Sequence, residues 1–275
     1  MFNFGFMTQD NFYDIIICGG GITGLLLAKK LIDDNYFKNH RIALIEKEDK
    51  NKNDRTISFW EEGKGDWDGI TCGSWNNAIF ISDEYESSFK LSPYTYKTIK
   101  GIDYYNYVKN KLDDKNNFKL IKDKVLEIKS NNSFSCVKTL NKEYSAPRVF
   151  TSIPTLEYKK QKFIPVLQQH FIGWFVKSEN PIFDPKKLIF MDFNLPQKGS
   201  TRFMYILPFD KNFALVEYTL FSKNKLKKDE YEDNIRKYLK GKNAGKYKVI
   251  EKEAGSIPMT GYNFSKHNKS TLLHI

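Results

Sequence analysis

The glycine cluster Gly19-x-Gly21-x-x-Gly24 constrains the fold of this chain more than any other feature of its sequence. A run of isoleucines precedes the cluster, and apolar residues recur at helical spacing over residues 25–31. A second short apolar run, IALI, then ends in Glu46. This order predicts a strand, a tight turn, a helix and a second strand.

Each part of this pattern has a separate role in holding a dinucleotide. Gly19 allows the tight turn, Gly21 lets backbone N–H groups approach a pyrophosphate, and Gly24 lets the helix pack on the strand. The helix N-terminus then offers unpaired N–H groups to the phosphates. Glu46 follows at the end of the second strand, where a carboxylate can accept hydrogen bonds from an adenosine ribose and disfavours the 2′-phosphate of NADP. The alternative interpretation is a glycine turn that only permits close helix packing.

Length and composition predict a folded protein with a substantial core. The chain has 275 residues, of which 40% are hydrophobic, enough for one large domain or two joined ones. Its three cysteines are far apart and form no C-x-x-C pair, which argues against a disulfide framework and favours a reducing, cytoplasmic compartment. The first 12 residues read as a lead-in segment without the basic and apolar regions of a signal peptide. No run of about 18 apolar residues occurs, so any membrane contact is expected to be peripheral.

The sequence patterns of several other chemistries are missing. The four histidines have no metal-ligand spacing such as H-E-x-x-H, so no metal site is predicted. No G-x-S-x-G elbow or P-loop pattern occurs either. Zinc, serine-hydrolase and nucleotide-hydrolysis chemistry are therefore set aside.

The net charge of +11 is concentrated in the second half of the chain. Residues 1–150 contain 22 Lys and Arg against 21 Asp and Glu, whereas residues 151–275 contain 22 against 12. Two lysine clusters, at residues 159–162 and 223–228, contribute to this excess. Such clusters attract nucleic acid or anionic lipid. The alternative is a solvated, lysine-rich surface.

The remainder of the first half predicts a continuation of the opening sheet. After the second strand a polar loop is expected to bring residues 54–56 back toward the nucleotide, although an arginine in such a loop can also be simply solvated. The pattern predicts short paired strands over about 76–92, a core helix over 103–112 and a third parallel strand over 118–121. Three short strands then form a meander that leads back into the sheet at residues 149–151.

A glycine fingerprint, a meander and later mixed strands are together typical of FAD-binding oxidoreductases, whereas NAD dehydrogenases usually alternate strand and helix. The expected fold class is therefore α/β. It combines an FAD-binding, Rossmann-like parallel sheet of the glutathione-reductase type, including a β-meander, with an antiparallel-sheet substrate-binding region. The FAD domain is expected over residues 12–155, with the strands near 76–92 contributing to the substrate region. The substrate sheet is expected over 156–240, and the chain returns to the FAD domain over 241–275.

The second half predicts four long strands rich in aromatic residues: QQHFIGWFVKS, KLIFMDF, TRFMYILPF and NFALVEYTLF. Such a sheet suits the floor of a pocket for a bulky apolar ligand, and the alternative is that the aromatic rings only fill a core. An amphipathic helix over 229–242 follows, and then a strand that runs into a turn at residues 255–258. The chain ends on a further apolar run, TLLHI, with no partner element after it, which suggests that the sequence is incomplete.

Glu217 lies in the last of these four strands. Phe213, Leu215 and Thr219 share its face, and the opposite face is also largely apolar, so the carboxyl is difficult to place in water. Burial disfavours the ionised form and raises a carboxyl pKa, which would keep Glu217 protonated and able to donate a proton. A glutamate at an edge strand or in a salt bridge is the alternative.

These motifs taken together resemble the flavin-dependent lycopene β-cyclases of bacteria and plants. The resemblance runs in the family's order from residue 13 to about residue 259. It rests on YDIIICGGGITGLLLAKKL, NDRTISFW, QHFIGWFVKS, LIFMDF, TRFMYILPF, ALVEYTLFS and EAGSIPM. Members of that family continue beyond the TLLHI-like strand, so the resemblance also suggests a C-terminal truncation.

The resemblance implies an isomerase, an intramolecular lyase, that closes the ends of lycopene or a related acyclic carotenoid into β-ionone rings. Reduced FAD is required, with NADPH as the usual electron donor. The family's catalytic carboxylate matches Glu217, and the stretch DRT-x-x-x-W gives Arg55 and Thr56 a place near the flavin. The expected cofactor-binding residues are Gly19, Gly20, Gly21, Gly24, Glu46, Arg55 and Thr56.

The implied substrate is a bilayer hydrocarbon, so an anionic membrane surface, and not nucleic acid, is the expected partner of the basic second half. The expected location is cytoplasmic and peripherally membrane-associated, whereas the oligomeric state does not follow from the sequence. Two alternative hypotheses remain. One is an FAD-dependent monooxygenase or oxidoreductase acting on a lipophilic substrate, and the other is an inactive fragment or a basic lipid-binding module.

Overall fold

The computed structural model describes residues 9–275, which form two compact units. The first unit contains the described residues up to Lys52, together with Tyr104–Glu157 and Tyr262–Ile275. The second unit contains Asn53–Asp103 and Tyr158–Gly261. The lead-in segment expected at the N-terminus lies mostly outside the described residues.

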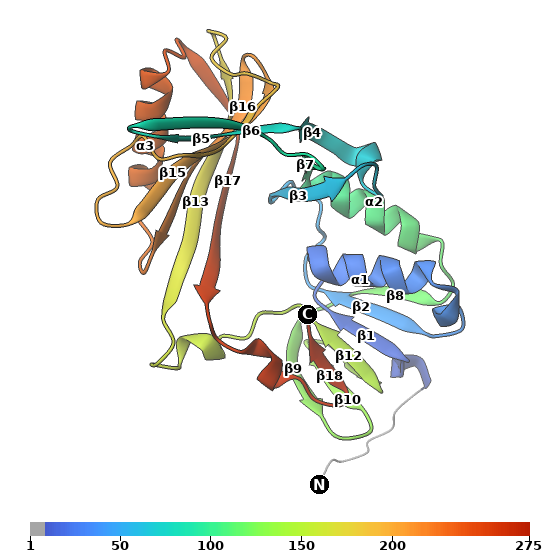
Figure 1. Cartoon of the computed structure of the whole chain (residues 1–275). Coiled ribbons are helices and arrows are strands. Elements are labelled where there is room, and N and C mark those ends of the chain that lie inside the picture. Colours follow the sequence, from blue (N-terminus) through green and yellow to red (C-terminus); the bar gives the residue numbers. More distant parts are fainter. Residues whose placement is uncertain (1–8) are drawn as a thin grey trace. The chain divides into compact units, whose positions relative to one another are not determined.

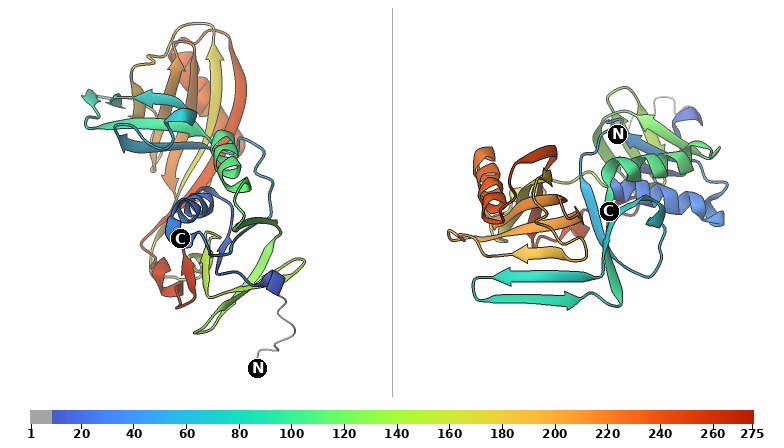
Figure 2. Two further views of the ribbon diagram at one scale, coloured as in Figure 1. Left: turned by 90° about the vertical axis from the view of Figure 1, so that its right-hand side faces the viewer. Right: turned by 90° about the horizontal axis from the view of Figure 1, so that it is seen from above.

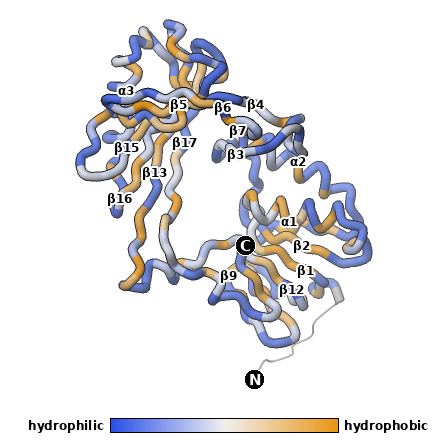
Figure 3. Tube along the Cα trace, viewed as in Figure 1, coloured by the Kyte–Doolittle hydropathy of each residue, from blue (hydrophilic) through white to orange (hydrophobic). Residues whose placement is uncertain are grey.

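A five-stranded parallel sheet organises the first unit (Figure 1). The strand order is β18-β12-β1-β2-β8. The bounds are Ile15–Cys18 for β1, Ile42–Glu46 for β2, Phe118–Lys122 for β8, Arg148–Thr151 for β12 and Leu272–His274 for β18. All four residues of β1 are buried, as expected for a central parallel strand covered on both faces. The apolar character of β1, β2 and β12 is visible in Figure 3.

Two helices and a meander complete this unit. Helix α1 covers Ile22–Asp33 and α2 covers Gly101–Asp113, where Tyr104, Val108 and Leu112 are buried as the helical pattern predicts. The Tyr104 hydroxyl donates a hydrogen bond to the Ile22 carbonyl oxygen over 2.8 Å. The meander consists of β9 (Val125–Ser130), β10 (Ser135–Thr139) and β11 (Glu143–Ala146), which form an antiparallel sheet. The predicted strand, turn, helix, strand opening and the meander are thereby confirmed.

The second unit is built on a seven-stranded sheet with the order β17-β13-β16-β15-β14-β5-β6. The bounds are Asn77–Ser82 for β5, Tyr85–Lys90 for β6, Val166–Ser178 for β13, Leu188–Asp192 for β14, Thr201–Asp210 for β15, Phe213–Ser222 for β16 and Tyr247–Thr260 for β17. All pairings are antiparallel except that of β14 with β5. The hairpin of β5 and β6, predicted as paired strands, therefore extends the expected four-stranded sheet (Figure 2).

A smaller sheet and a helix accompany the large sheet. The small sheet has the order β3-β7-β4, with bounds Thr56–Glu62, Tyr94–Lys100 and Thr71–Trp75 respectively. Helix α3 covers Lys228–Gly241, as the amphipathic pattern predicts. Short 3-10 helices occupy Gln9–Asn11, Asn35–Phe37, Asp68–Ile70, Glu157–Lys159 and Phe264–His267.

The two faces of the large sheet pack against different parts of the second unit. One face packs on α3 and forms a core in which Trp174, Val216 and Tyr218 meet Ile235 and Leu239 of the helix. The opposite face carries the alternate residues of the same strands, and Phe175, Leu207 and Leu215 pack there with Trp75 and Tyr96. Residues that point to this second face are not covered by α3, so they are available for a cavity.

The prediction of a turn at residues 255–258 is wrong. Strand β17 continues through these residues to Thr260 and pairs with β13 along its whole length. Pro258 is accommodated because β17 is an edge strand, where the missing N–H interrupts no ladder on the outer side. Gly255 is required here for a different reason, since a Cβ at this position would lie 2.3 Å from the ring of Phe171.

The boundaries of the units also differ from the sequence-based division. Residues 53–75 and 93–103 belong with the large sheet, as the strands near 76–92 do, because β3, β4 and β7 lie in the second unit. Residues 241–261 belong there as well, since β17 pairs with β13. The last strand, β18, is in the first unit, where it pairs in parallel with β12.

Candidate functional site

The second unit contains a cavity of about 360 Å³ against the face of the large sheet that α3 leaves uncovered. Five of its lining residues come from five different strands: Thr56 from β3, Phe171 from β13, Tyr205 from β15, Glu217 from β16 and Glu253 from β17. Two glutamate carboxyl groups and two aromatic rings therefore border one space, together with the ion pair of Asp54 and Arg55.

The strand register places the two carboxyl groups on either side of a glycine. Gly173 of β13 pairs with Glu217 of β16 on one side and with Glu253 of β17 on the other. Adjacent strands lie about 4.8 Å apart, so the two glutamate backbones are roughly 10 Å apart. A Cβ at Gly173 would lie 2.9 Å from the Leu215 Cδ1, 3.3 Å from the Glu253 Cγ and 3.5 Å from the Glu217 Cβ. The absence of a side chain at Gly173 thus lets the side chains of Leu215, Glu217 and Glu253 pack close together over β13.

Glu217 is a buried acid, as its strand pattern predicts. Only 8% of the residue is exposed, and its carboxyl accepts a hydrogen bond from the Thr219 hydroxyl. Burial raises the pKa of the Glu217 carboxyl to about 8, the Thr219 hydrogen bond opposes this rise, and the charge of Glu253 adds to it. The carboxyl is therefore mostly protonated near neutral pH.

Glu253 was not identified as a site residue from the sequence. Its carboxyl accepts a hydrogen bond of 2.7 Å from the Thr56 hydroxyl. Burial raises the pKa of Glu253, whereas hydrogen bonds from the hydroxyl and the backbone of Thr56 lower it. The sequence signal was weak, because an alternating strand such as VIEKEAG contains charged residues on both faces, and only the pairing with β13 places Glu253 opposite Gly173.

A chain of hydroxyl groups reaches the cavity beside Glu217. Tyr205, which pairs with Glu217 across β15 and β16, exchanges a hydrogen bond of 2.8 Å with Tyr96 and lies 3.5 Å from the Ser58 hydroxyl. Burial raises the pKa of both phenols, so they remain neutral. The sequence patterns did not connect Ser58 and Tyr96 with the site, because they come from β3 and β7 of the separate small sheet.

The aromatic rings of Tyr205 and Phe171 give the cavity an environment suited to a cation. The face of an aromatic ring is negative, so it attracts a positive charge within about 6 Å. The ring of Phe171 lies directly against Gly255, where no side chain separates it from the β17 backbone. An apolar, cation-tolerant wall therefore adjoins the two carboxyl groups.

The glycine turn of the first unit has the predicted geometry. Gly19 has φ +101°, in the left-handed region that favours glycine, and a Cβ at Gly24 would lie 1.9 Å from the Gly19 carbonyl oxygen. A Cβ at Gly21, by contrast, would meet no atom within 4 Å. Gly21 is the N-cap of α1, and because it has no side chain, it does not cap the N–H groups of the first helical turn. These N–H groups therefore face space that a pyrophosphate can fill.

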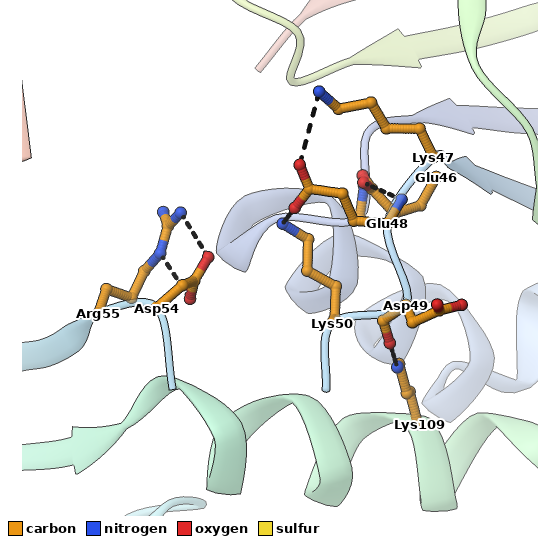
Figure 4. Close-up of polar contacts among 9 residues, drawn as sticks. Glu46, Lys47, Glu48, Asp49, Lys50, Asp54, Arg55 and Lys109 are labelled. Carbon is orange, nitrogen blue, oxygen red and sulfur yellow. Dashed lines mark hydrogen bonds and ion pairs between the residues drawn. The ribbon is translucent and has the colours of Figure 1, made fainter. Parts of the chain in front are cut away.

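Glu46 lies beside this turn. Its carboxylate accepts a hydrogen bond from the Gly20 N–H over 2.6 Å. It accepts another from the Glu48 N–H over 2.9 Å (Figure 4). A small pocket of about 120 Å³ lies next to Gly20 and Glu46, and Lys50 and Lys109 are among the residues that line it. The residues present therefore fit a dinucleotide whose ribose lies near Glu46.

Arg55 and Thr56 belong to the second unit, where both line the cavity of the two carboxyl groups. The Arg55 guanidinium forms an ion pair with the neighbouring Asp54 over 3.0 Å (Figure 4). The Thr56 hydroxyl donates a hydrogen bond to the Glu253 carboxyl. The structure thus brings Arg55 and Thr56 together with Glu217, and their contact with a flavin stays a prediction.

Residues 9–275 contain neither a membrane-spanning helix nor a group of metal-ligating side chains. None of the helices in this part of the chain has the length and apolar character that crossing a bilayer requires. Within the same residues, no group of three or more His, Cys, Asp and Glu is arranged to hold a metal ion.

The fold is similar to those of several solved flavoenzyme-like structures. A geranylgeranyl bacteriochlorophyll reductase-like protein from Thermoplasma acidophilum matches with a TM-score of 0.66 and 12% identity, over 96% of this chain and 70% of that one. The p-nitrophenol 4-monooxygenase PnpA from Pseudomonas putida matches with a TM-score of 0.66 and 14% identity, over 95% and 70%. The probable FAD-dependent monooxygenase pqsL from Pseudomonas aeruginosa matches with a TM-score of 0.61 and 12% identity, over 96% and 78%. These likenesses confirm the predicted α/β fold class.

Sequence comparison gives a more specific result. Among curated protein sequences, none matches the chain. The sequence model of the family described as lycopene cyclase protein, however, matches residues 14–273, which is nearly the whole chain. The protein therefore belongs to the lycopene cyclase family, as its motifs predict.

Proposed function

We propose that this protein is a flavin-dependent lycopene β-cyclase, an isomerase that closes the ψ end groups of lycopene or a related acyclic carotenoid into β-ionone rings. The observation that carries the proposal is the buried Glu217 carboxyl, which is mostly protonated near neutral pH in a cavity with aromatic walls. Membership of the lycopene cyclase family supplies the class of substrate.

Ring closure needs an acid in surroundings that hold little water. The Glu217 carboxyl donates its proton to the terminal double bond of the substrate, and a tertiary carbocation forms. The rings of Phe171 and Tyr205 stabilise that cation while an internal double bond attacks it. Loss of a proton then leaves the ring, so the reaction proceeds without net oxidation or reduction.

The cofactor that we propose is FAD in its reduced form, with NADPH as the electron donor. Gly19, Gly20, Gly21 and Gly24 form the turn that holds its pyrophosphate, and Glu46 binds its ribose. When bound, the reduced flavin supplies negative charge that stabilises a nearby cation. Arg55 and Thr56 are proposed to contact the flavin.

The proposed partner that delivers the substrate is an anionic membrane surface, at the cytoplasmic side and without any role for nucleic acid. Three exposed residues, Leu167, Ile257 and Met259, form an apolar strip on the same sheet face as Glu253. Ile257 also lines the cavity, so the strip leads from the protein surface to the carboxyl groups. Beside β13, Phe163 is 97% exposed and follows the exposed lysines of the 159–162 cluster. Apolar side chains flanked by lysines suit an anionic bilayer surface.

Expression in cells that accumulate lycopene tests the proposal directly. We expect the wild-type protein to convert lycopene into β-carotene. The Glu217→Gln variant should lose at least about 100-fold in conversion, because a positioned acid contributes 10²- to 10⁴-fold. Flavin content, measured by absorbance of the purified protein, should stay unchanged in the variant. Retained conversion by Glu217→Gln would exclude this residue as the acid.

The second candidate function is an FAD-dependent monooxygenase or oxidoreductase that acts on a lipophilic substrate. It is favoured by the likeness of the fold to PnpA and to pqsL. An anaerobic assay with lycopene and NADPH separates the two functions, since only the cyclase forms product without oxygen. A basic lipid-binding module, or an inactive fragment, predicts no turnover in either assay, and the module also predicts no bound flavin.

A further inference from the structure

The cyclisation chemistry leaves one feature of the cavity without a role. Glu217 supplies a proton, yet Glu253 borders the same cavity and faces Glu217 across Gly173. Proteins seldom hold two carboxyl groups in one partly buried space without a reason, because each one loses hydration there. The geometry points to a second proton-transfer step at this position.

Ring closure ends with a proton loss that needs an acceptor. After the new carbon–carbon bond forms, the positive charge lies on a ring carbon that carries a methyl group. Three neighbours of that carbon can lose a proton: the ring carbon that bears the polyene chain, the ring methylene and the methyl group. Each choice leaves the double bond in a different place, so the position of the base decides which ring is made.

Burial raises the pKa of both carboxyl groups, but their hydrogen-bond partners differ. Glu217 is 8% exposed, and its carboxyl accepts a hydrogen bond from the Thr219 hydroxyl. Glu253 receives hydrogen bonds from the hydroxyl and the backbone of Thr56, which stabilise its ionised form. Two carboxyl groups whose environments differ in this way divide into an acid and a base, and the charge of Glu253 itself favours the protonated form of Glu217.

We propose that Glu253 is the general base that completes ring closure, an assignment that rests on the proposed cyclase function. The C–H bond on a carbon next to the cationic carbon breaks, its electron pair forms the ring double bond, and the proton moves to a Glu253 carboxylate oxygen. Each ring thus transfers one proton from Glu217 to the substrate and another from the substrate to Glu253. Glu253 is less deeply buried than Glu217, so it can return its proton to solvent before the next turnover.

The strand register keeps the two carboxyl groups near one another. Their backbones are roughly 10 Å apart, on the two strands that flank β13. Both glutamates line the same cavity, so an end group held there is near the acid and the base together. Cyclisation can proceed without a large movement of the substrate between the two proton transfers.

The test compares Glu253→Gln with Glu251→Gln. Glu251 lies two residues earlier on the same strand and face, bonds to Asn53 and does not line the cavity. We expect Glu253→Gln to lower the rate of cyclisation about 100-fold or more and to change the ratio of ring double-bond isomers in the residual product. Glu253→Asp should recover part of the rate, and Glu251→Gln should retain the rate and product of the wild type. Flavin content should be equal in all four proteins.

Two outcomes would overturn the assignment, and they differ. If the wild type is active and Glu253→Gln has the same rate and the same product ratio, the role of Glu253 is overturned, while the proposed cyclase function stands. A flavin-loaded wild type that forms no cyclic product overturns the proposed function, and the assignment of Glu253 with it. Chromatography of the carotenoids, with detection of each ring isomer, distinguishes these cases.

Discussion

At the scale of single residues, the site depends on where the chain omits side chains as much as on where it places them. Gly173 lies between the strands of the two glutamates and leaves room for the side chain of Leu215, and Gly255 makes room for the ring of Phe171. Glu217 is buried in this site, and desolvation raises its pKa to about 8. The burial that keeps Glu217 protonated should therefore also change how the free energy of unfolding depends on pH.

Glu217 should make the free energy of unfolding depend on pH. Its pKa is about 8 in the folded protein and about 4.5 without burial. Between these values the folded state binds a proton that the unfolded state lacks, so stability falls as pH rises from about 4.5 to about 8. Each unit of pKa shift corresponds to about 1.4 kcal/mol. Glu217→Gln should therefore lose less stability than the wild type between pH 5.5 and pH 8.5.

Urea unfolding at several pH values measures this difference. Titrating groups that are distant from Glu217 act equally in both proteins, so the difference reports Glu217 together with Glu253, whose charge raises the pKa of Glu217. Glu251→Gln is the matched control and should follow the wild-type dependence. Equal pH dependence of the wild type and Glu217→Gln would contradict a raised pKa at this position.

At the scale of elements, the turn between β1 and α1 separates structural glycines from a glycine left open to a ligand. Gly24 allows contact with the Gly19 carbonyl oxygen, so a larger residue there would disturb the packing of α1 on the sheet. Gly21 has φ −74°, which any residue can adopt, and open space where a side chain would be. The fold itself does not require glycine at position 21, which leaves ligand binding as its reason.

Gly21→Val should therefore remove flavin without unfolding the protein. The valine side chain would occupy the space through which the backbone N–H groups approach a pyrophosphate. We expect the purified variant to contain at least tenfold less flavin, with a melting temperature within a few degrees of the flavin-free wild type. Gly69→Val, at another open glycine in the second unit, should keep its flavin. Undiminished flavin in Gly21→Val would refute the assigned pocket.

At the scale of the whole molecule, charge and exposed apolar surface coincide in the second unit. The sequence places most of the net positive charge after residue 150. The structure adds that Phe163 and the apolar strip of Leu167, Ile257 and Met259 are exposed in the same unit as the 159–162 lysine cluster. A lysine-rich surface alone is compatible with solvation, whereas lysines beside exposed apolar side chains favour a bilayer surface.

Replacing Lys159, Lys160 and Lys162 by glutamine should weaken binding to anionic vesicles. Each well-placed lysine contributes roughly 1 kcal/mol near an anionic surface, so we expect at least a tenfold loss. Co-sedimentation with phosphatidylcholine vesicles that contain phosphatidylglycerol measures this effect. The control replaces three lysines of the 223–228 cluster, Lys223, Lys225 and Lys227, and should bind as the wild type does. Equal losses in both variants would indicate a general effect of charge and contradict a specific docking surface.

The sequence by itself determined the features that depend on local pattern. The glycine turn with its strand and helix, the meander, the four aromatic strands and the burial of Glu217 all follow from residue spacing over short stretches. Spacing of this kind reports hydrophobic periodicity and backbone conformation, which neighbouring residues decide. The resemblance to lycopene β-cyclases, carried by the order of these motifs, added the family, which sequence comparison confirms.

Only the tertiary structure decided how distant strands pair. Register between β13, β16 and β17 placed Glu253 beside Glu217, carried β17 through Pro258 without a turn, and moved residues 241–261 into the second unit. Strand pairing is non-local, because each register is fixed by packing of side chains far apart in the chain. Protonation states depend on the same packing, since desolvation is a property of the assembled surroundings and not of the sequence around a carboxyl group.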